Sequence, residues 1–153
     1  MSPYLRFAVM IAVSTAIMFA LMYLNVFAAD HIFFSQTRLF MALIMGSVMA
    51  VVMLAFMRRM YRNRIANAAI VVLSLLTFAG SLYLVRSQAT VGQIAWMKAM
   101  IPHHSIAILT SERATLTDPR VRDLAAGIIE TQREEITRMK QLIAELGKGP
   151  GSR

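Results

Sequence analysis

The chain has 153 residues, of which 58% are apolar and 16% are charged, with a formal charge of +8. A soluble domain of average make-up is less apolar than this. Residues 87–153 hold nine Lys and Arg against seven Asp and Glu, so most of the positive charge lies among the apolar runs of residues 1–86. Nucleic-acid binding needs a concentrated basic face, which this distribution does not supply. The absence of cysteine excludes disulfides, thiolate nucleophiles and Cys-based zinc sites.

Three apolar segments come first in chain order, and we expect each to cross a lipid bilayer as a helix. They cover about residues 4–29, 39–57 and 65–85, and about 20 apolar residues suffice to span a hydrocarbon core of ~30 Å. The first segment has an alternative interpretation as a cleaved signal peptide, because residues 26–28 (VFA) resemble a cleavage site. Its apolar run exceeds the usual h-region and only one Arg precedes it, which favours an uncleaved helix.

The arginines predict the orientation of these segments. The link between the second and third segments, RRMYRNR, contains four of them, and the positive-inside rule places such a link in the cytoplasm. The link between the first and second segments, DHIFFSQTR, has few charges and suits the outer face. We therefore expect a multi-pass protein of the bacterial inner membrane, with a cytoplasmic N-terminus and a periplasmic C-terminal domain.

The composition changes abruptly after Arg86, where charges begin to recur every few residues. We predict a membrane domain over residues 1–86, an extracytoplasmic two-helix hairpin over 87–147 and a flexible tail over 148–153. The expected fold class is all-α, with three transmembrane helices followed by this hairpin.

Residues with strong helix-end preferences mark the two helices of the hairpin. The first is predicted over about 91–113, where Thr90 opens a capping-box pattern. The second begins with Asp118 as its N-cap and Pro119 as its first helical residue, and it stops at Gly147.

Methionine and histidine recur at helical spacing in the stretch WMKAMIPHHSIAI, residues 96–108. Met100 follows Met97 by three residues, and His103 and His104 follow Met100 by three and four, although adjacent histidines point about 100° apart on a helix. Two interpretations remain open from the spacing. The residues form a metal site of thioethers and imidazoles, or the methionines belong to the hairpin core and the histidines are solvated.

Two polar residues, Gln132 and Glu135, interrupt the apolar seam of the second predicted helix. Polar side chains inside a seam need partners. They are expected to pair with His103 or His104 across the hairpin, or with a metal. The alternative is an interhelical hydrogen bond that fixes the register of the two helices.

The segments MKAMIPHHSIAI and DPRVRDLAAGIIETQREEITRM together resemble a family of bacterial domains of unknown function. Some members of that family are periplasmic copper-binding, ferritin-like helical proteins. The resemblance covers residues 97–143 and implies a set of candidate metal ligands with two further ligands or supporting residues. The candidate ligands are Met97, Met100, His103, His104 and Met139, and the two further residues are Gln132 and Glu135.

Thioether and imidazole form a soft-to-borderline ligand set. With no thiolate in the chain, this set predicts copper, as Cu(I), in preference to zinc or magnesium. A separate pair, Asp30 and His31, lies at the outer end of the first span. A carboxylate beside an imidazole either binds a metal or marks the membrane interface.

The second span carries a row of methionines at four-residue spacing, beside a row of small residues that permits close helix packing. The methionines are either a thioether ladder for Cu(I) or fillers of irregular apolar gaps. Packing is favoured, since no charged residue within the span accompanies the row. The two rows are Met41, Met45, Met49, Met53 and Met57, and Ala42, Gly46 and Ala50.

The predicted function is that of a membrane protein whose periplasmic domain binds copper in metal handling or sensing, with a copper-handling partner. The alternative is a non-catalytic interaction module whose hairpin self-associates or docks a partner. No P-loop, Gly-rich dinucleotide turn or supported Ser/His/Asp motif indicates an enzyme. The apolar stripes of the hairpin are wider than one helix contact covers, which predicts a homodimer that forms a four-helix bundle.

Overall fold

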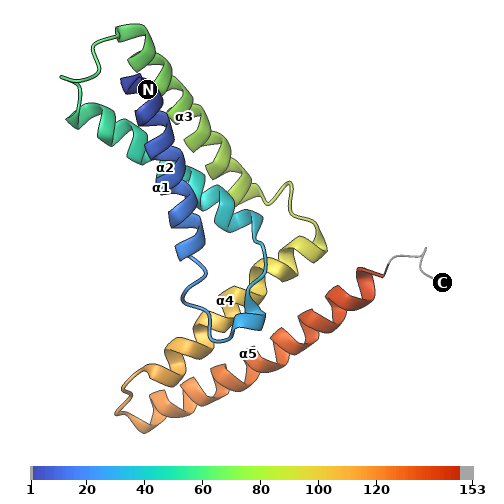
Figure 1. Ribbon diagram of the computed structural model, residues 1–153. Coiled ribbons are helices and arrows are strands. Elements are labelled where there is room, and N and C mark those ends of the chain that lie inside the picture. Colours follow the sequence, from blue (N-terminus) through green and yellow to red (C-terminus); the bar gives the residue numbers. More distant parts are fainter. Residues whose placement is uncertain (1, 149–153) are drawn as a thin grey trace. The chain divides into compact units, whose positions relative to one another are not determined.

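The computed structural model describes residues 2–148, and these residues form helices and connecting segments without a strand. The predicted all-α class is thereby confirmed, while most of the predicted tail, residues 149–153, lies outside the described part of the chain. Figure 1 shows the helices in chain order. They are α1 (Pro3–Leu21), the 3₁₀ turn η1 (Ala29–His31), α2 (Gln36–Phe56), α3 (Arg64–Ser87), α4 (Gln93–Arg113) and α5 (Pro119–Leu146).

The chain divides into two compact units. The first comprises Met1–Met22 and Thr37–Thr90, and the second comprises Tyr23–Gln36 and Val91–Arg153. The segment Tyr23–Gln36, called the link below, therefore belongs with α4 and α5. On the sequence alone we grouped the link with the membrane spans, because nothing local in it indicates its partners.

The three helices of the first unit are long and apolar enough to cross a membrane, with 19, 21 and 24 residues. They correspond to the three predicted spans, but α1 ends at Leu21 rather than near residue 29. Arg38 donates a hydrogen bond to the carbonyl of Met22 at 2.6 Å. A cationic donor at this position satisfies the end of the helix, so the backbone leaves the helix while the sequence is still apolar.

Small residues line the buried face of α2. Ala42, Gly46 and Ala50 are buried, whereas Met41 is exposed and the other methionines of the row are half-buried. A Cβ placed on Gly46 would lie 2.3 Å from Oγ1 of Thr15, so a larger residue here would require the Thr15 side chain to move. The buried face of α2 is therefore the small-residue row.

The α5 helix begins where the sequence predicts. Asp118 is its N-cap and accepts a hydrogen bond from the backbone N–H of Arg120 at 2.9 Å, and Pro119 is the first helical residue. The N-cap of α4 differs from the expected Thr90. Gly92 is the N-cap of α4 and makes no side-chain capping bond, so the helix starts two residues later than the capping-box pattern requires.

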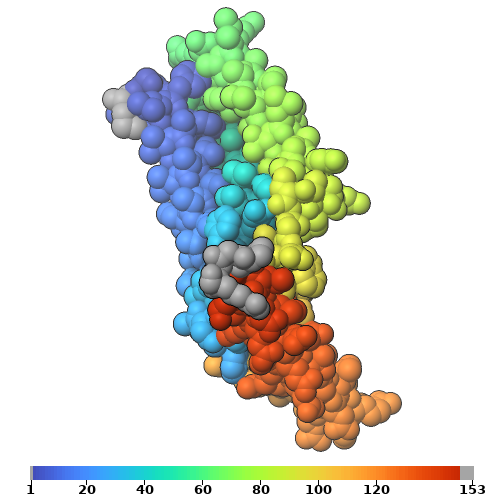
Figure 2. Space-filling model, turned by 90° about the vertical axis from the view of Figure 1, so that its right-hand side faces the viewer, coloured from blue at the N-terminus to red at the C-terminus, as the bar shows by residue number. Residues whose placement is uncertain are grey.

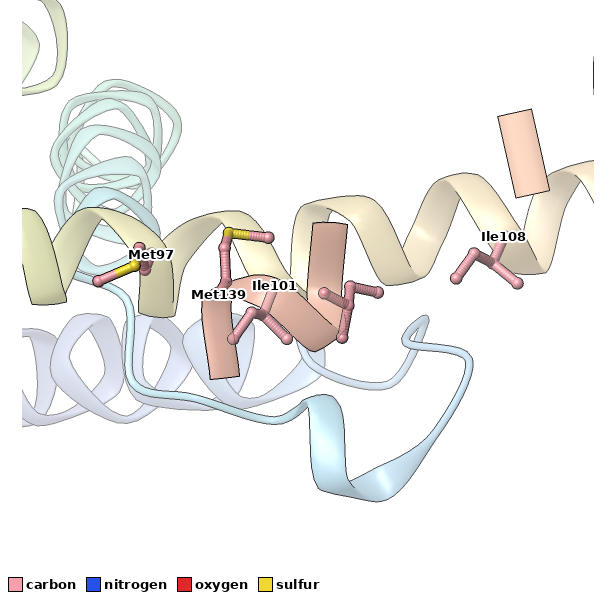
Figure 3. Packing of buried hydrophobic residues seen from close by; sticks show 5 residues of the cluster. Met97, Ile101, Ile108 and Met139 are labelled. Atoms are coloured by element: carbon pink, nitrogen blue, oxygen red, sulfur yellow. The ribbon is translucent and has the colours of Figure 1, made fainter. Parts of the chain in front are cut away.

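The α4 and α5 helices pack against each other through one apolar cluster. Its members are Met97, Ile101 and Ile108 from α4 with Ile136 and Met139 from α5. Figure 3 shows Met139 reaching from α5 toward α4 beside Ile101. From the link, Phe33 packs against the same cluster. The core of the second unit thus combines the consecutive helices α4 and α5 with a segment that is distant in the sequence.

Candidate functional site

Neighbouring residues of α4 make different polar contacts on the two sides of the α4–α5 pair. Successive helical residues point about 100° apart. Ser105 contacts the link, whereas His104 contacts Glu135 of α5. We call the side of the pair that carries Ser105, together with Arg133 and Lys140, the covered side. The open side carries His104 and Glu135.

On the covered side, Ser105 holds two parts of the link. Its side chain is fully buried, and its hydroxyl oxygen accepts a hydrogen bond from the backbone N–H of Phe27 at 2.7 Å. Nδ1 of His31 lies 2.9 Å from the same oxygen. Because the oxygen already accepts from Phe27, its own proton is available to His31 Nδ1. In the neutral tautomer with the ring proton on Nε2, Nδ1 accepts this hydrogen bond.

The charges on the covered side form pairs between the link, α4 and α5. Lys140 Nζ donates to Asp30 Oδ2 at 2.6 Å, and Arg133 Nη2 donates to Glu112 Oε1 at 2.6 Å. The Arg133 guanidinium also lies 5.3 Å from the ring centroid of Phe27, within the range of a cation–π contact.

Burial lowers the pKa of His31, and the Lys140 ammonium acts in the same direction. The Asp30 carboxylate opposes this effect without cancelling it. The hydrogen bond from Lys140 in turn lowers the pKa of Asp30. At neutral pH the covered side therefore holds a neutral imidazole between charged groups.

Asp30, His31 and Ser105 are the residue types of a hydrolytic triad, but their arrangement serves another purpose. Asp30 Oδ1 lies 3.9 Å from His31 Nε2, beyond hydrogen-bond distance. The hydroxyl of Ser105 is fully buried and holds the link in place. A nucleophile must reach its substrate, so this group fixes the link rather than attacking a bond.

On the open side, His104 presents a buried nitrogen to a carboxylate. Nδ1 of His104 lies 3.0 Å from Oε2 of Glu135. The two atoms are not aligned as a hydrogen bond, and among residues 2–148 this nitrogen has no other partner. Burial lowers the pKa of His104 against the opposing effect of Glu135, and the nearby imidazole of His103 lowers it further. In the neutral tautomer with its proton on Nε2, the imidazole presents a lone pair at Nδ1 to the carboxylate.

The predicted thioether ligands lie in or against the core. The side chains of Met97 and Met139 are 5% and 7% exposed within the α4–α5 cluster (Figure 3). Met100 is half-buried, packs against the same cluster and lies one turn before His104. Of the three sulfurs, that of Met100 is the most accessible.

The remaining predicted ligands differ in their surroundings. His103 is exposed, with its ring centroid 6.1 Å from that of His104. Gln132 is half-buried on α5, three residues before Glu135. Within the described residues 2–148, no three His, Cys, Asp or Glu side chains come close enough to share a metal ion.

The Asp30–His31 pair belongs to the covered side. His31 contacts Ser105, and Asp30 contacts Lys140 of α5. Because residues 104 and 105 point about 100° apart, His31 and His104 lie on different sides of α4. The structure therefore keeps this pair separate from the His104–Glu135 contact.

Ser105 is the residue that sequence reasoning missed. It follows Ile101 by four residues and precedes Ile108 by three, so it occupies a position in the apolar seam of α4. Gln132 and Glu135 were identified in α5 because a polar residue in a seam needs a partner. The same rule applied to α4 identifies Ser105 as a buried hydroxyl that requires one.

Comparisons with known proteins match the C-terminal part of the chain. The model of the family described as Domain of unknown function (DUF305) matches residues 84–148. An uncharacterised protein of Acanthamoeba polyphaga mimivirus is 38% identical over 65 residues, which cover 41% of this chain and 43% of that protein. The chain thus spans about two fifths of the length of this relative. No solved structure matches. The matched residues include the His-His and Gln-x-x-Glu patterns on which the resemblance was based.

Proposed function

We propose that this protein resides in the bacterial inner membrane and binds copper, as Cu(I), through its periplasmic helical domain, in metal handling or sensing. One observation carries the proposal. The buried Nδ1 of His104 has no hydrogen-bond partner within residues 2–148 and faces the Glu135 carboxylate at 3.0 Å. Buried polar atoms are nearly always partnered, and an exception calls for an explanation such as an ion.

A cation between the two groups satisfies both of them. The neutral imidazole offers a lone pair at Nδ1, and the carboxylate offers a charged oxygen. Met100 lies one turn from His104 and adds a thioether donor. Imidazole with thioether suits copper better than the oxygen-seeking ions magnesium and calcium.

In this proposal some side chains bind the ion in their present positions, and others become ligands only after they move. His104 and Glu135 anchor the ion, and Met100 is the nearest sulfur donor along α4. Met97 and Met139 support the site by packing and become ligands only if their side chains leave the core. His103 and Gln132 flank the anchor, and each supplies a further ligand only after a change of rotamer.

The test is copper stoichiometry on the full chain in detergent under reducing conditions. We expect the wild type to bind copper and His104→Ala to lose at least about 90% of it, since the anchoring imidazole is gone. His31→Ala, which changes the other side of α4, is the matched control and should bind as the wild type does. Equal binding by His104→Ala and the wild type would exclude the proposed site.

The location of the domain has its own test. The proposal places residues after Arg86 in the periplasm, on the strength of the four arginines in RRMYRNR. A reporter enzyme that is active only outside the cytoplasm should be active when fused after Arg153. An inactive fusion, with the same reporter active in the α2–α3 connection, would reverse the orientation. A periplasmic domain would receive copper from, or pass it to, a copper-handling partner.

A second candidate function is self-association through the open side. Three residues in the first half of α5 leave large apolar surfaces exposed, which are Val121 (44%), Leu124 (65%) and Ile128 (37%). Ile128 precedes Glu135 by two helical turns, so this stripe continues the open side. Figure 2 shows the first half of α5, in orange, at the surface. A second copy of the chain that pairs stripe to stripe would form a four-helix bundle.

Cross-linking in detergent distinguishes this candidate. Leu124→Lys should abolish the cross-linked dimer, because it places a charge in the apolar contact. Ala126→Lys is the control, since residue 126 points about 200° away from residue 124. A monomeric wild type would contradict the proposed dimer but would not contradict the proposed copper site.

A further inference from the structure

The link and the α4–α5 pair line a cavity of about 280 Å³ on the covered side, and this cavity is open to solvent. Its apolar lining includes Phe27, Ile108 and Ile136, and its polar lining consists of His31, Arg133, Thr137 and Lys140. The volume lies just below the usual range for drug-sized ligands. It leaves room for a small polar group with a few water molecules.

The charged side chains that line this cavity are all cationic. Arg133 and Lys140 belong to the lining, whereas their carboxylate partners Glu112 and Asp30 do not. Each pairing uses one N–H of a group that has several, since a guanidinium has five donors and an ammonium has three. The charges of the two cations are balanced by Asp30 and Glu112 outside the lining, but each cation keeps unused N–H donors that can serve a ligand.

The surroundings hold these donors in place before any ligand arrives. The stack on Phe27 and the bond to Glu112 fix the Arg133 guanidinium. In the tautomer of His31 that accepts from Ser105 at Nδ1, the ring proton lies on Nε2 and is a further donor. A preorganised group loses less conformational entropy on binding, which favours affinity.

We propose that the cavity binds a phosphate group, either free or in the headgroup of a phospholipid. Arg133, Lys140 and His31 donate from three separate side chains, which suits the several oxygens of a tetrahedral anion better than one planar carboxylate. Thr137 adds a hydroxyl to the lining. Phe27, Ile108 and Ile136 supply an apolar wall beside the anion. This site is independent of the proposed copper site, because it uses the covered side.

Titration of the full chain with inorganic phosphate, in zwitterionic detergent, tests the proposal. We expect saturable binding that shifts the NMR signals of the Thr137 amide and the His31 ring. Arg133→Gln and Lys140→Gln should each weaken binding at least about tenfold, since each removes a charged hydrogen bond. Arg138→Gln, which removes an exposed α5 arginine outside the cavity lining, should change it by less than about twofold.

Two further measurements separate local effects from general ones. Arg133→Lys keeps the charge and loses the guanidinium fork, so it should retain more affinity than Arg133→Gln. Circular dichroism checks that each variant keeps the helical content of the wild type. Absence of a saturable shift at Thr137, or equal weakening by Arg138→Gln, would overturn the proposal.

The source of the phosphate is identified in vesicles. If the natural ligand is a phospholipid, anionic phosphatidylglycerol vesicles should reduce the apparent affinity for inorganic phosphate relative to vesicles of equal surface charge made from phosphate-free glycolipid and fatty acid, and Lys140→Gln should abolish that difference. If the ligand is free phosphate, its affinity should be the same in both vesicles and should still depend on Arg133 and Lys140.

Discussion

His104 and Ser105 are neighbours in the sequence, yet they sit in opposite chemical situations. On the covered side, Ser105 is fully buried and its hydroxyl contacts both Phe27 and His31. On the open side, His104 buries a nitrogen that faces a carboxylate without a hydrogen bond, and no other group of residues 2–148 partners it. A buried polar group with partners specifies structure, whereas one without them indicates a role that a ligand completes.

The largest change in unfolding free energy is expected for a substitution in the apolar core that α4 and α5 share. Ile101 is fully buried between α4 and α5, so Ile101→Ala removes buried methyl and methylene groups and leaves a cavity. We expect a loss of about 2–5 kcal/mol in unfolding free energy, measured by hydrogen exchange of the α4 amides. Arg122→Ala, an exposed position on α5, is the control, with a change below about 0.5 kcal/mol. Equal effects would mean that the two helices do not depend on this cluster.

Ser105→Ala probes the covered side alone. It leaves the Phe27 N–H and His31 Nδ1 without their buried partner, at a cost of about 1–3 kcal/mol. Hydrogen exchange at the Phe27 amide should accelerate accordingly, while α5 amides near Leu146 should change little. Ser111→Ala, on the same helix and away from the link, is the matched substitution. A slow-exchanging Phe27 amide in Ser105→Ala would show that other contacts hold the link.

Acidification should lower the free energy of unfolding through His31 on the covered side and His104 on the open side. Burial holds the pKa values of His31 and His104 below the ordinary value of 6.5. The unfolded chain therefore binds more protons than the folded one once the pH falls below about 6.5, and the free energy of unfolding decreases from about pH 7 to pH 5. Above pH 7 these groups contribute no pH dependence.

Denaturant unfolding across this pH range measures the effect. His31→Gln and His104→Leu should each flatten the dependence, and the double variant should flatten it most. A wild type that gains stability on acidification would contradict the burial of neutral imidazoles.

The smallest change in stability is expected for His104→Leu. Replacing a buried nitrogen that lacks a hydrogen-bond partner by an apolar group of similar size is nearly neutral, so we expect a change below about 1 kcal/mol. Copper binding should nevertheless be lost. A destabilisation as large as that of Ser105→Ala would make the His104–Glu135 contact structural and remove the contrast between the two sides.

Sequence reasoning succeeded where the signal is local. The start of α5 follows from Asp118 and Pro119, whose side chain and ring act within one helical turn. The three candidate spans follow from their apolar length. The start of α4 is two residues later than expected from Thr90. The capping-box pattern is also a local signal, and Gly92, two residues further on, serves as the N-cap instead.

Features that depend on contacts between distant residues were not predicted from the sequence. The link follows an apolar helix, and its contacts with Ser105 and Lys140 span 78 and 110 residues. Burial, not residue type, separates Met97 and Met139 in the core from Met100 near the open side. The His104–Glu135 contact was among the predicted pairings, but the spacing did not distinguish it from one with His103.

The long separation between the link and its partners also sets an order of events during synthesis. Phe27 leaves the ribosome 78 residues before Ser105, an interval of roughly 4–16 s at usual elongation rates. During that time Phe33, which later packs against the α4–α5 core, has no such surface to cover it. The link is thus synthesised well before the helices that hold it, and it completes its contacts only after they form. A substitution that destabilises α5 therefore also destabilises the link.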